Sequence, residues 1–442
     1  MNHRVLTFLL VGSLWASLLP AETTLPGIFS DGVVLQRGLP ILIWGNAPKG
    51  EKVTVSFRDA SGSTEADQDN KWRIELPAQM PGGPFTLFIQ GSNKIELKDV
   101  YVGDVWLASG QSNANIRTEK PIPETERQET IRQFTGYMKG YNNDIYPLCT
   151  WTTGLTWYQL AWVFARDIAE KEKVPIGILC CAQGGSGINQ FMVQPHNKVY
   201  PSCYERLIEP LLPFRIKGVI WWQGENNTWE RCPTMDEPNI RYHKEMIVVV
   251  EGWRKIWNQG EFPFLYVQLQ RSNSPDLPNN LFSWPTIRDG QRLALSIPNT
   301  AMVVSFDVTT GNLHPPFPEK TIIAKRMAVA AEALAYGKMN LEWSGPVFES
   351  AKKEGDNVVI RFTHAGKNLV AREGDLKEFE IRSGDGKWTE TKAIITANTV
   401  VIPSAGLAPP LRVRYACKSY PRGNLYNSDE LPASPFITDE IR

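Results

Sequence analysis

A serine in a turn that ends a strand-like run is the first residue of this sequence with the potential for chemistry. Ser112 lies in the segment 110–113, Gly-Gln-Ser-Asn, shortly after the apolar run 100–107. A serine hydroxyl can act as a nucleophile when it lies at the mouth of a strand, where backbone N–H groups can face the substrate. Gly, Ser and Asn are also ordinary turn formers, so the tetrapeptide taken alone is more often a surface turn.

Three further polar turns follow later apolar runs of the chain. They are residues 184–187 after the run 175–181, residues 223–227 after the run 216–222, and residues 312–315 after the run 301–306. The carboxyl ends of parallel strands meet at one edge of a sheet, so these turns are expected to lie together. One turn holds Ser112 and another holds His314, and this combination indicates a catalytic site.

The elements that must position these turns have the pattern of a parallel sheet. The apolar runs, together with the run 262–269, alternate with helical patterns at 158–172, 238–258, 284–296 and 319–336. Near-continuous apolar strands separated by helices predict a parallel sheet that is covered on both faces. The predicted fold class is therefore α/β.

β-rich regions are expected on either side of this α/β part. Short candidate strands separated by Gly, Pro, Asn and Asp predict a small sandwich over residues 22–98; they are 33–36, 41–44, 53–57, 72–76 and 85–89. The α/β domain is predicted over 99–336. A C-terminal β-rich region follows over 337–442, with candidate strands at 358–362 and 411–415.

Composition points to an ordinary globular protein. The 442 residues are 42% hydrophobic and 21% charged, which is enough chain for two or three domains. Lys+Arg and Asp+Glu are both 47, so the formal net charge is zero and neither a nucleic-acid partner nor an anionic membrane surface is indicated.

The N-terminus is typical of an export signal. A positive start at residues 2–4 precedes an apolar stretch at 5–19 that is short for a membrane span, and Ala21 offers a cleavage point before Glu22. No later run holds 18 apolar residues, so we expect no membrane insertion after removal of a signal peptide at 1–21. The predicted location is periplasmic or secreted.

The six cysteines leave disulfide pairing open, because six cysteines allow 15 pairings. Cys180 and Cys181 are adjacent in a predicted strand, so their side chains point to opposite faces and they are poor partners for each other. No Cys/His cluster suggests a metal site.

The four turns together resemble the signature blocks of the SGNH (GDSL-like) hydrolases, and in particular those of the sialate O-acetylesterase family. The matching segments are 103–113 for the nucleophile block, 184–192 for the second block, 218–227 for the third and 313–320 for the fourth. Phe191 stands where the family usually has Trp. Segment 28–37 resembles the family's opening segment, and segments 413–415, 424–427 and 431–436 resemble its closing part, so the resemblance covers nearly the whole mature chain.

This resemblance implies a fold, an activity and a class of substrate. The fold is an SGNH-hydrolase three-layer α/β/α sheet flanked by N-terminal and C-terminal β-rich regions. The activity is a serine O-acetylesterase acting on acetylated sugars, with sialic acid as the named substrate. Neither a metal nor an organic cofactor is implied, and the expected partner is an acetylated sugar or glycan.

The catalytic roles follow from the same blocks. Ser112 is the predicted nucleophile, and His314 is the predicted general base because it follows the final strand, where a triad histidine is expected. The candidates for the oxyanion hole are the backbone N–H of Gly185 and the side-chain amides of Gln223 and Asn227. Each such donor is worth roughly 3 kcal/mol of activation barrier.

Other side chains carry two interpretations each. Glu225 is expected to support the nucleophile turn or its own loop rather than act as an acid or base. Arg288 can hold a substrate carboxylate, or it is an ordinary arginine on a helix surface. Trp222 and Trp229 can stack on a sugar ring, or they belong to the core.

The fourth block departs from the family pattern in two ways. The family commonly has an acid two residues before the histidine, where this chain has Asn312, and the stretch from His314 to Lys320 is about two residues longer. Asp307 is the nearest acid upstream. We favour a Ser112–His314 dyad in which a backbone carbonyl orients the imidazole.

Three functions remain open on the sequence. The first is an O-acetylesterase of sialic acids, and the second is the same chemistry on acetyl-xylan or another polysaccharide. The third, suggested by Asn312, is a catalytically weak carbohydrate-binding relative.

Overall fold

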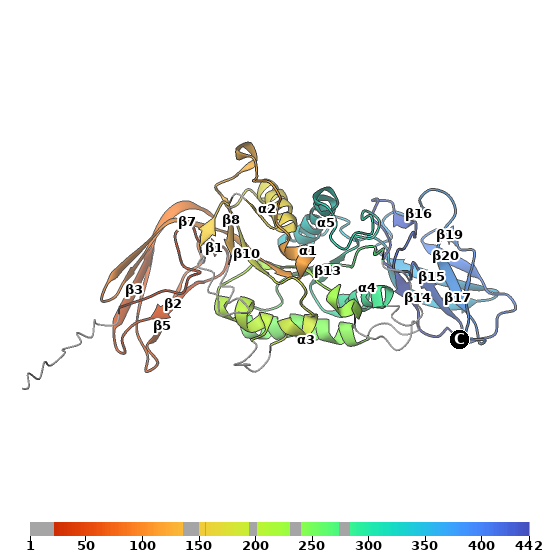
Figure 1. Cartoon of the computed structure of the whole chain (residues 1–442), viewed down its shortest axis with the longest axis horizontal. Helices are drawn as coiled ribbons and strands as arrows, with labels where there is room; N and C mark the ends of the chain where they lie inside the picture. The colour runs from red at the N-terminus through yellow and green to blue at the C-terminus, as the bar shows by residue number, and fades with distance from the viewer. Residues whose placement is uncertain are drawn as a thin grey trace, which may run out of the picture.

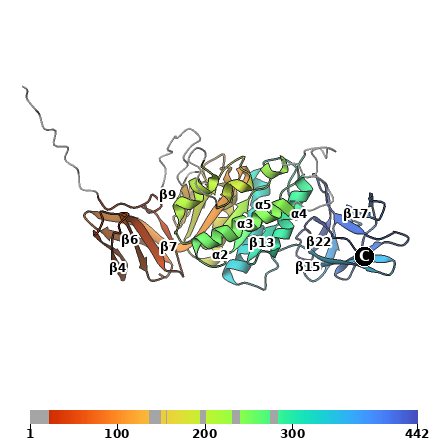
Figure 2. The same cartoon turned by 90° about the horizontal axis from the view of Figure 1, so that it is seen from below.

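A computed structural model describes residues 22–135, 150–154, 156–193, 201–229, 240–273 and 283–441. The predicted signal segment 1–21 lies outside the described residues. The molecule is elongated, with a β-rich region at each end and an α/β layer structure between them (Figures 1 and 2). The mixed α/β fold expected from the sequence is confirmed.

A seven-stranded sheet forms the centre of the molecule. Its strand order is β13-β12-β11-β7-β10-β8-β9, and every neighbouring pair is parallel except the edge pair β8–β9. The bounds are β7 (Lys94–Gly110), β8 (Ile131–Thr135), β9 (Trp151–Thr152), β10 (Ile176–Ala182), β11 (Gly218–Trp222), β12 (Phe264–Val267) and β13 (Thr300–Val303). The apolar runs predicted as central strands all lie in this sheet.

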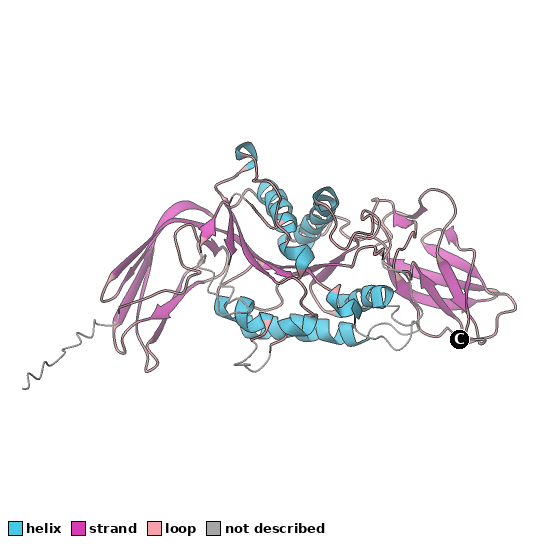
Figure 3. Cartoon of the chain, viewed as in Figure 1, coloured by secondary structure: helices cyan, strands magenta, loops and turns pink. Residues whose placement is uncertain are grey.

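Helices cover both faces of the central sheet (Figures 1 and 3). On one face lie α2 (Gln159–Glu172) and α5 (Phe317–Tyr336), and on the other lie α3 (Ile240–Trp257) and α4 (Ser283–Leu293). Successive strand residues point to opposite faces. Cys180 accordingly packs in the core beside α2 and α5, and Cys181 packs in the core on the other face.

Short helices complete the α/β region. They are α1 (Ser112–Asn115), η1 (Glu124–Glu126), η2 (Ile188–Phe191), η3 (Tyr204–Ile208), η4 (Glu209–Leu211), η5 (Asn226–Trp229) and η6 (Ala294–Ser296). No described helix combines the length and the apolar character needed to cross a membrane. Among the six cysteines, four lie in the described part of the chain, and all four are free thiols.

The N-terminal region consists of two groups of strands around one core. The bounds are β1 (Val34–Gln36), β2 (Ile41–Asn46), β3 (Lys52–Phe57), β4 (Ala60–Glu65), β5 (Lys71–Leu76) and β6 (Gly82–Gln90). β2 pairs with β5, whereas β4, β3 and β6 continue in that order to β7.

The strand β7 belongs to both regions. Its first half pairs with β6, from Lys94 opposite Gln90 to Val102 opposite Gly82, and its second half pairs with β10 and β11. The predicted domain boundary between residues 98 and 99 therefore falls inside one continuous strand. Sequence periodicity did not reveal this continuity because residues 94–99 alternate polar and apolar side chains, as the strands of a half-exposed sheet do.

The C-terminal region is built from β-strands alone. Two four-stranded sheets, β14-β15-β20-β19 and β18-β17-β21-β23, share one core with the pair β16-β22. The bounds are β14 (Val347–Glu354), β15 (Asn357–Thr363), β16 (Leu369–Ala371), β17 (Phe379–Arg382), β18 (Trp388–Glu390), β19 (Ile394–Thr396), β20 (Thr399–Pro403), β21 (Arg412–Tyr415), β22 (Leu425–Asn427) and β23 (Phe436–Ile437).

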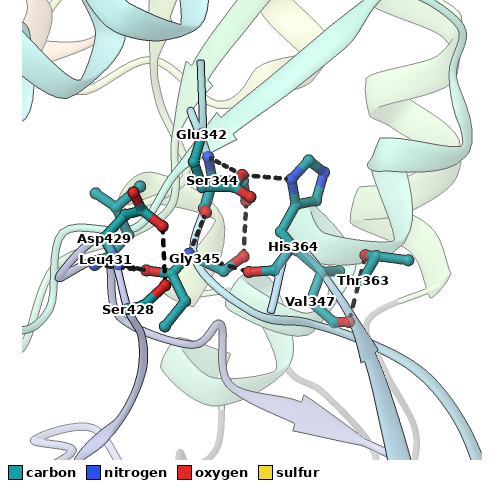
Figure 4. A network of polar contacts seen from close by, with 10 residues as sticks. Glu342, Ser344, Gly345, Val347, Thr363, His364, Ser428, Asp429 and Leu431 are labelled. Atoms are coloured by element: carbon teal, nitrogen blue, oxygen red, sulfur yellow. Dashed lines mark hydrogen bonds and ion pairs between the residues drawn. The ribbon is translucent and has the colours of Figure 1, made fainter. Parts of the chain in front are cut away.

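A polar network fastens the segment after α5 to this C-terminal region (Figure 4). Glu342 Oε1 lies 2.8 Å from His364 Nδ1. The side-chain amide of Asn427 donates to the backbone carbonyls of Ser344 at 2.9 Å and His364 at 3.0 Å. His364 thus has a structural role in the C-terminal region, and it follows all four turns in the sequence.

Candidate active site

The nucleophile turn depends on a glycine at the end of β7. Gly110 has φ +123°, and a Cβ atom there would lie 2.1 Å from the carbonyl oxygen of Trp222. The next residue, Gln111, donates its backbone N–H to that same oxygen at 2.9 Å. Only glycine fits both the backbone angle and the close approach. Ser112 then begins the short helix α1 at the carboxyl edge of the sheet.

The four turns lie together, as the strand pattern predicted. A Cβ atom on Gly184 would lie 3.7 Å from Ser112 Cβ, which brings the second turn beside the first. Asn113 Nδ2 donates to Glu225 Oε1 of the third turn at 2.6 Å and to the carbonyl oxygen of Leu313 in the fourth turn at 2.9 Å. The side chain that follows the serine thus connects three of the turns.

Two backbone N–H groups are available for an oxyanion. Within the described parts of the chain, the N–H groups of Ser112 and Gly185 have no hydrogen-bond acceptor. Gly185 has φ +74°, and no heavy atom lies within 4 Å of where its Cβ would be. Residues with a side chain rarely adopt this backbone angle. A glycine at position 185 therefore lets the turn present its backbone N–H groups toward the neighbouring serine. Gly185 stays a predicted oxyanion donor.

Gln223 is engaged inside the protein, which argues against its predicted role in the oxyanion hole. It is fully buried, and its Nε2 donates to Gln111 Oε1 at 3.2 Å, to the Ser186 carbonyl at 3.1 Å and to Asn227 Oδ1 at 2.7 Å. Its Oε1 accepts from the Tyr242 hydroxyl at 2.9 Å. An amide nitrogen has two hydrogens, so these acceptors saturate it. We correct the prediction: Gln223 joins the turns instead of binding the substrate.

Asn227 stays a predicted oxyanion donor. Its Oδ1 accepts hydrogen bonds from Gln223 at 2.7 Å and from the backbone N–H of Ile188 at 3.0 Å. These two bonds fix which end of the amide is the oxygen and hold the buried side chain in one orientation.

His314 lies exposed at the rim of a groove beside the site. Partial burial, assisted by the positive charge of Lys320, lowers the pKa of His314 below its ordinary value of 6.5. The neutral imidazole, which is the form that can accept a proton, is therefore favoured. Among the described residues, no hydrogen bond joins the imidazole to the Ser112 hydroxyl, and catalytic hydrogen bonds are often long before substrate binds.

The backbone that carries His314 is held by two buried amides. The carbonyl oxygen of Leu313 accepts from Asn113 Nδ2 at 2.9 Å and from Gln270 Nε2 at 3.0 Å. Gln270 also donates to Glu225 Oε1 at 3.4 Å. Sequence reasoning missed Gln270, because a single glutamine after the run 262–269 belongs to no motif. Its importance arises only from the packing of β12 beside β11.

Two buried titratable groups near this turn, Glu225 and Lys320, interact electrostatically. Burial raises the pKa of Glu225, although hydrogen bonds from Asn113 and Gln270 oppose the shift. Burial lowers the pKa of Lys320 to about 8, with the charge of Glu225 acting in the opposite direction. In the described part of the chain, Lys320 Nζ and Glu225 Oε2 have no hydrogen-bond partner. Glu225 has the contacts of a supporting residue.

The two side chains considered as partners for His314 have different positions. Asp307 forms a two-pronged ion pair with Arg326, with N···O distances of 2.8 and 2.7 Å, and it lies partly buried against α5. Asn312 is exposed and donates from Nδ2 to the Thr310 hydroxyl at 3.3 Å. Neither side chain forms a hydrogen bond with His314.

Arg288 is a structural residue, which contradicts both of its interpretations, the contact with a substrate carboxylate and the ordinary arginine on a helix surface. Its side chain is fully buried. The guanidinium donates to the carbonyl oxygens of Leu269 at 2.8 Å, Lys418 at 2.8 Å and Ser419 at 2.9 Å, and also to that of Gln270. It therefore ties the end of β12 to the C-terminal region.

Trp222 is also buried, which corrects its predicted role in sugar stacking. It has no exposed surface, and its Nε1 donates to Gln270 Oε1 at 3.3 Å. Trp229, at the end of η5, is by contrast 86% exposed. Across the described ranges, no group of three His, Cys, Asp or Glu side chains forms a candidate metal site.

Comparison with known proteins identifies the family of the chain. Residues 102–333 match the family described as carbohydrate esterase, sialic acid-specific acetylesterase. Human (Homo sapiens) sialate O-acetylesterase is 26% identical over 495 residues, covering 93% of this chain and 91% of the relative. The mouse (Mus musculus) enzyme of the same name is 25% identical over 500 residues, with 90% of each chain covered.

A solved structure extends the likeness to the whole fold. The crystal structure of a carbohydrate acetylesterase from Xanthomonas citri has a TM-score of 0.84 and 31% sequence identity, covering 94% of this chain and 99% of that chain. The central sheet and both β-rich regions described above thus belong to one shared architecture. The protein is a carbohydrate esterase of the sialic acid-specific acetylesterase family.

Proposed function

We propose that the protein removes O-acetyl groups from sialic acids through a serine acyl-enzyme. The observation that carries the proposal is the pair of bonds made by Asn113, the residue after the proposed nucleophile Ser112. They fasten the serine turn to the turn of the proposed base His314, so that the two groups come from adjacent, fixed segments. The substrate is suggested by the family description and by the names of the mammalian relatives.

The reaction follows from the roles of these groups. Neutral His314 accepts the proton of the Ser112 hydroxyl as its oxygen attacks the acetyl carbonyl carbon. The N–H groups of Ser112 and Gly185, with the amide of Asn227, stabilise the negative oxygen that develops. The imidazolium then protonates the departing sugar oxygen. In the second half, His314 deprotonates water, which attacks the acetyl-serine. The imidazolium then returns this proton to the Ser112 oxygen as acetate leaves, which restores the serine and the neutral histidine.

The orientation of His314 is proposed to come from a backbone carbonyl rather than an acid. Asp307 is held by Arg326, and Asn312 is an amide that faces solvent. A carbonyl oxygen can accept the second imidazole N–H and select the tautomer, as a triad acid does. The catalytic unit is thus a Ser112–His314 dyad.

Acetate release by wild type and Ser112→Ala tests this proposal. The substrates are mucin rich in O-acetylated sialic acid, acetyl-xylan and 4-nitrophenyl acetate. Ser112→Ala should lose nearly all turnover on each substrate. The control is Ser186→Ala. The Ser186 hydroxyl lies 3.2 Å from Cys203 Sγ inside the protein, so this substitution should leave turnover unchanged.

Each alternative gives a different result in this experiment. Near-wild-type turnover in Ser112→Ala would show that another residue is the nucleophile. Acetate from acetyl-xylan but not from mucin would replace the sialic acid substrate by a polysaccharide. An inactive wild type that still binds the glycans would favour a carbohydrate-binding relative.

We further propose that the protein is exported to the periplasm or the medium, with residues 1–21 as its signal peptide. The support is the positive start followed by the short apolar stretch before Glu22. N-terminal sequencing of the mature protein should begin at Glu22, and a protein that retains Met1 would contradict export by this route.

A further inference from the structure

A groove of about 790 Å³ opens beside the proposed base. One wall is formed by the segment after α1, from Ile116 to Pro123, and the other by the segment from His314 to Thr321. Side chains of α2 lie between them. The volume falls within the range of about 300–1,000 Å³ that is usual for ligand sites, and it greatly exceeds what an acetyl group needs.

The groove reaches the proposed base and the segment that follows the proposed nucleophile, although Ser112 itself does not line it. His314 is one of its lining residues. Ile116 is another, and its backbone N–H bonds the carbonyl oxygen of Ser112 at 2.9 Å. In the proposed mechanism the acetyl ester lies within reach of both Ser112 and His314, so the sugar that carries it would lie near the end of the groove that His314 lines.

The lining has the mixed character that suits a sugar chain. Apolar surfaces come from Pro315, Phe317 and Pro318 on one wall and from Ile122 on the other. Phe317 is a large apolar side chain that remains 37% exposed. Flat apolar surfaces, such as the faces of aromatic rings, can pack against the C–H faces of sugar rings.

Charged side chains at the groove supply hydrogen-bonding groups for hydroxyls. Glu119 and Lys120 are exposed there, and Arg166 pairs with Glu126 at 3.3 Å. Two charges of each sign leave the groove without a strong net field. This favours an occupant that is rich in hydroxyl groups over one that is recognised by charge alone.

We propose that this groove binds the sugar chain to which the acetylated residue is attached. The preferred substrate is then an acetylated oligosaccharide rather than a free acetylated monosaccharide. This inference rests on the proposed esterase function, because the position of the acetyl group at Ser112 is what places the chain in the groove.

Two substitutions to tryptophan at neighbouring positions of α5 provide a matched test. Thr321 lines the groove and lies partly exposed, so Thr321→Trp should fill the groove without disturbing the core. Ile322 is 44% exposed on the same helix but does not line the groove. Ile322→Trp therefore controls for a bulky aromatic group on α5.

The measurement is kcat/KM for O-acetylated sialyllactose, free O-acetylated sialic acid and 4-nitrophenyl acetate. Wild type should prefer the sialyllactose over the free sugar by about tenfold, equivalent to about 1.4 kcal/mol. Thr321→Trp should abolish this preference, mainly through KM, and leave 4-nitrophenyl acetate unchanged. Ile322→Trp should behave as wild type on all three substrates.

Several results would overturn the proposal. One is equal kcat/KM for the chain and the free sugar in wild type. Others are an equal loss on all three substrates in Thr321→Trp, or no loss in that variant. A wild type inactive on both sialic esters would instead refute the sialic acid substrate. The comparison then uses acetylated xylotriose and acetylated xylose. If wild type prefers the xylotriose and Thr321→Trp removes this preference, the result supports sugar-chain binding in the groove. If wild type shows no such preference, the proposal is overturned.

Discussion

At the scale of single residues, buried polar side chains surround the turn that carries His314. Lys320 affects His314 electrostatically, and Asn113 and Gln270 hold the carbonyl before it. These contacts fix the backbone that precedes His314. They also lead to two predictions about single side chains.

The first prediction concerns the pH dependence of kcat/KM. The general base must be neutral, so activity falls on the acid side around the pKa of His314, which lies below 6.5. Lys320→Met removes a positive charge that lowers this pKa, so the acid limb should move toward higher pH. Lys325→Met is the control, because Lys325 is an exposed lysine on the same helix. An acid limb that stays in place in Lys320→Met would contradict the electrostatic role.

The second prediction separates Asp307 from catalysis. Because its carboxylate pairs with Arg326 inside the fold, Asp307→Asn should lower the free energy of unfolding by about 3 kcal/mol. Turnover on 4-nitrophenyl acetate should remain within about twofold of wild type when folded protein is assayed, a difference worth about 0.4 kcal/mol of barrier. Asn312→Asp should raise turnover modestly or leave it unchanged. A loss of several orders of magnitude in Asp307→Asn would make Asp307 the third catalytic member.

Residue identities could be predicted from sequence where a turn motif specified them, and not where burial decided the role. Ser112, Glu225 and His314 stood out through their spacing after apolar runs. Arg288 and Trp222 were assigned to the substrate, yet both are fully buried. A polar or amphipathic side chain looks the same in a sequence whether it faces a ligand or a set of backbone carbonyls, and only the packing distinguishes the two.

At the scale of secondary-structure elements, strongly apolar strands were predictable and polar ones were not. The central strands β10, β11, β12 and β13 followed from near-continuous apolar runs. β4 was missed because Ala-Ser-Gly-Ser-Thr-Glu has no apolar alternation; it is held by pairing with β3. β8 was missed as well, since Arg132 and Gln133 interrupt its apolar pattern although both are buried.

The third prediction concerns the turn between β10 and η2. Gly185→Val should lower kcat by about 10²–10³ with little change in KM, because a β-branched residue disfavours φ +74° and so displaces a proposed oxyanion donor. Gly50→Val is a matched control, since Gly50 has φ +76° and equally open space, but it lies in the N-terminal region. Equal kcat values in the two variants would leave Gly185 as an ordinary turn residue.

At the scale of the whole molecule, a buried arginine joins the site to the C-terminal region. Arg288 donates to carbonyls on both sides of this junction, including that of Gln270. The C-terminal strands therefore contribute to the position of Gln270, and through it to the Leu313 carbonyl next to His314.

The fourth prediction tests this junction. Arg288→Met should lower the free energy of unfolding by at least about 3 kcal/mol, since several buried carbonyls lose their donor. The folded fraction should also have a lower kcat, because Gln270 loses its fixed backbone. Chemical denaturation and a 4-nitrophenyl acetate assay measure the two effects. Arg292→Met is the comparison, because Arg292 pairs within α4 with Asp289. Wild-type kcat in folded Arg288→Met would show that the junction serves stability alone.

The continuity of β7 limits how this protein can be divided or recombined. The strand that begins in the N-terminal sheet at Lys94 is also the middle strand of the catalytic sheet and leads directly to Ser112. A fragment that starts at residue 99 would lack β6, so Val100 and Val102 would lose their partners Phe85 and Gly82 and this edge of β7 would be exposed. The N-terminal region is consequently not an exchangeable module. A chimaera with a related esterase should exchange it only together with β7, or cross over after the nucleophile turn.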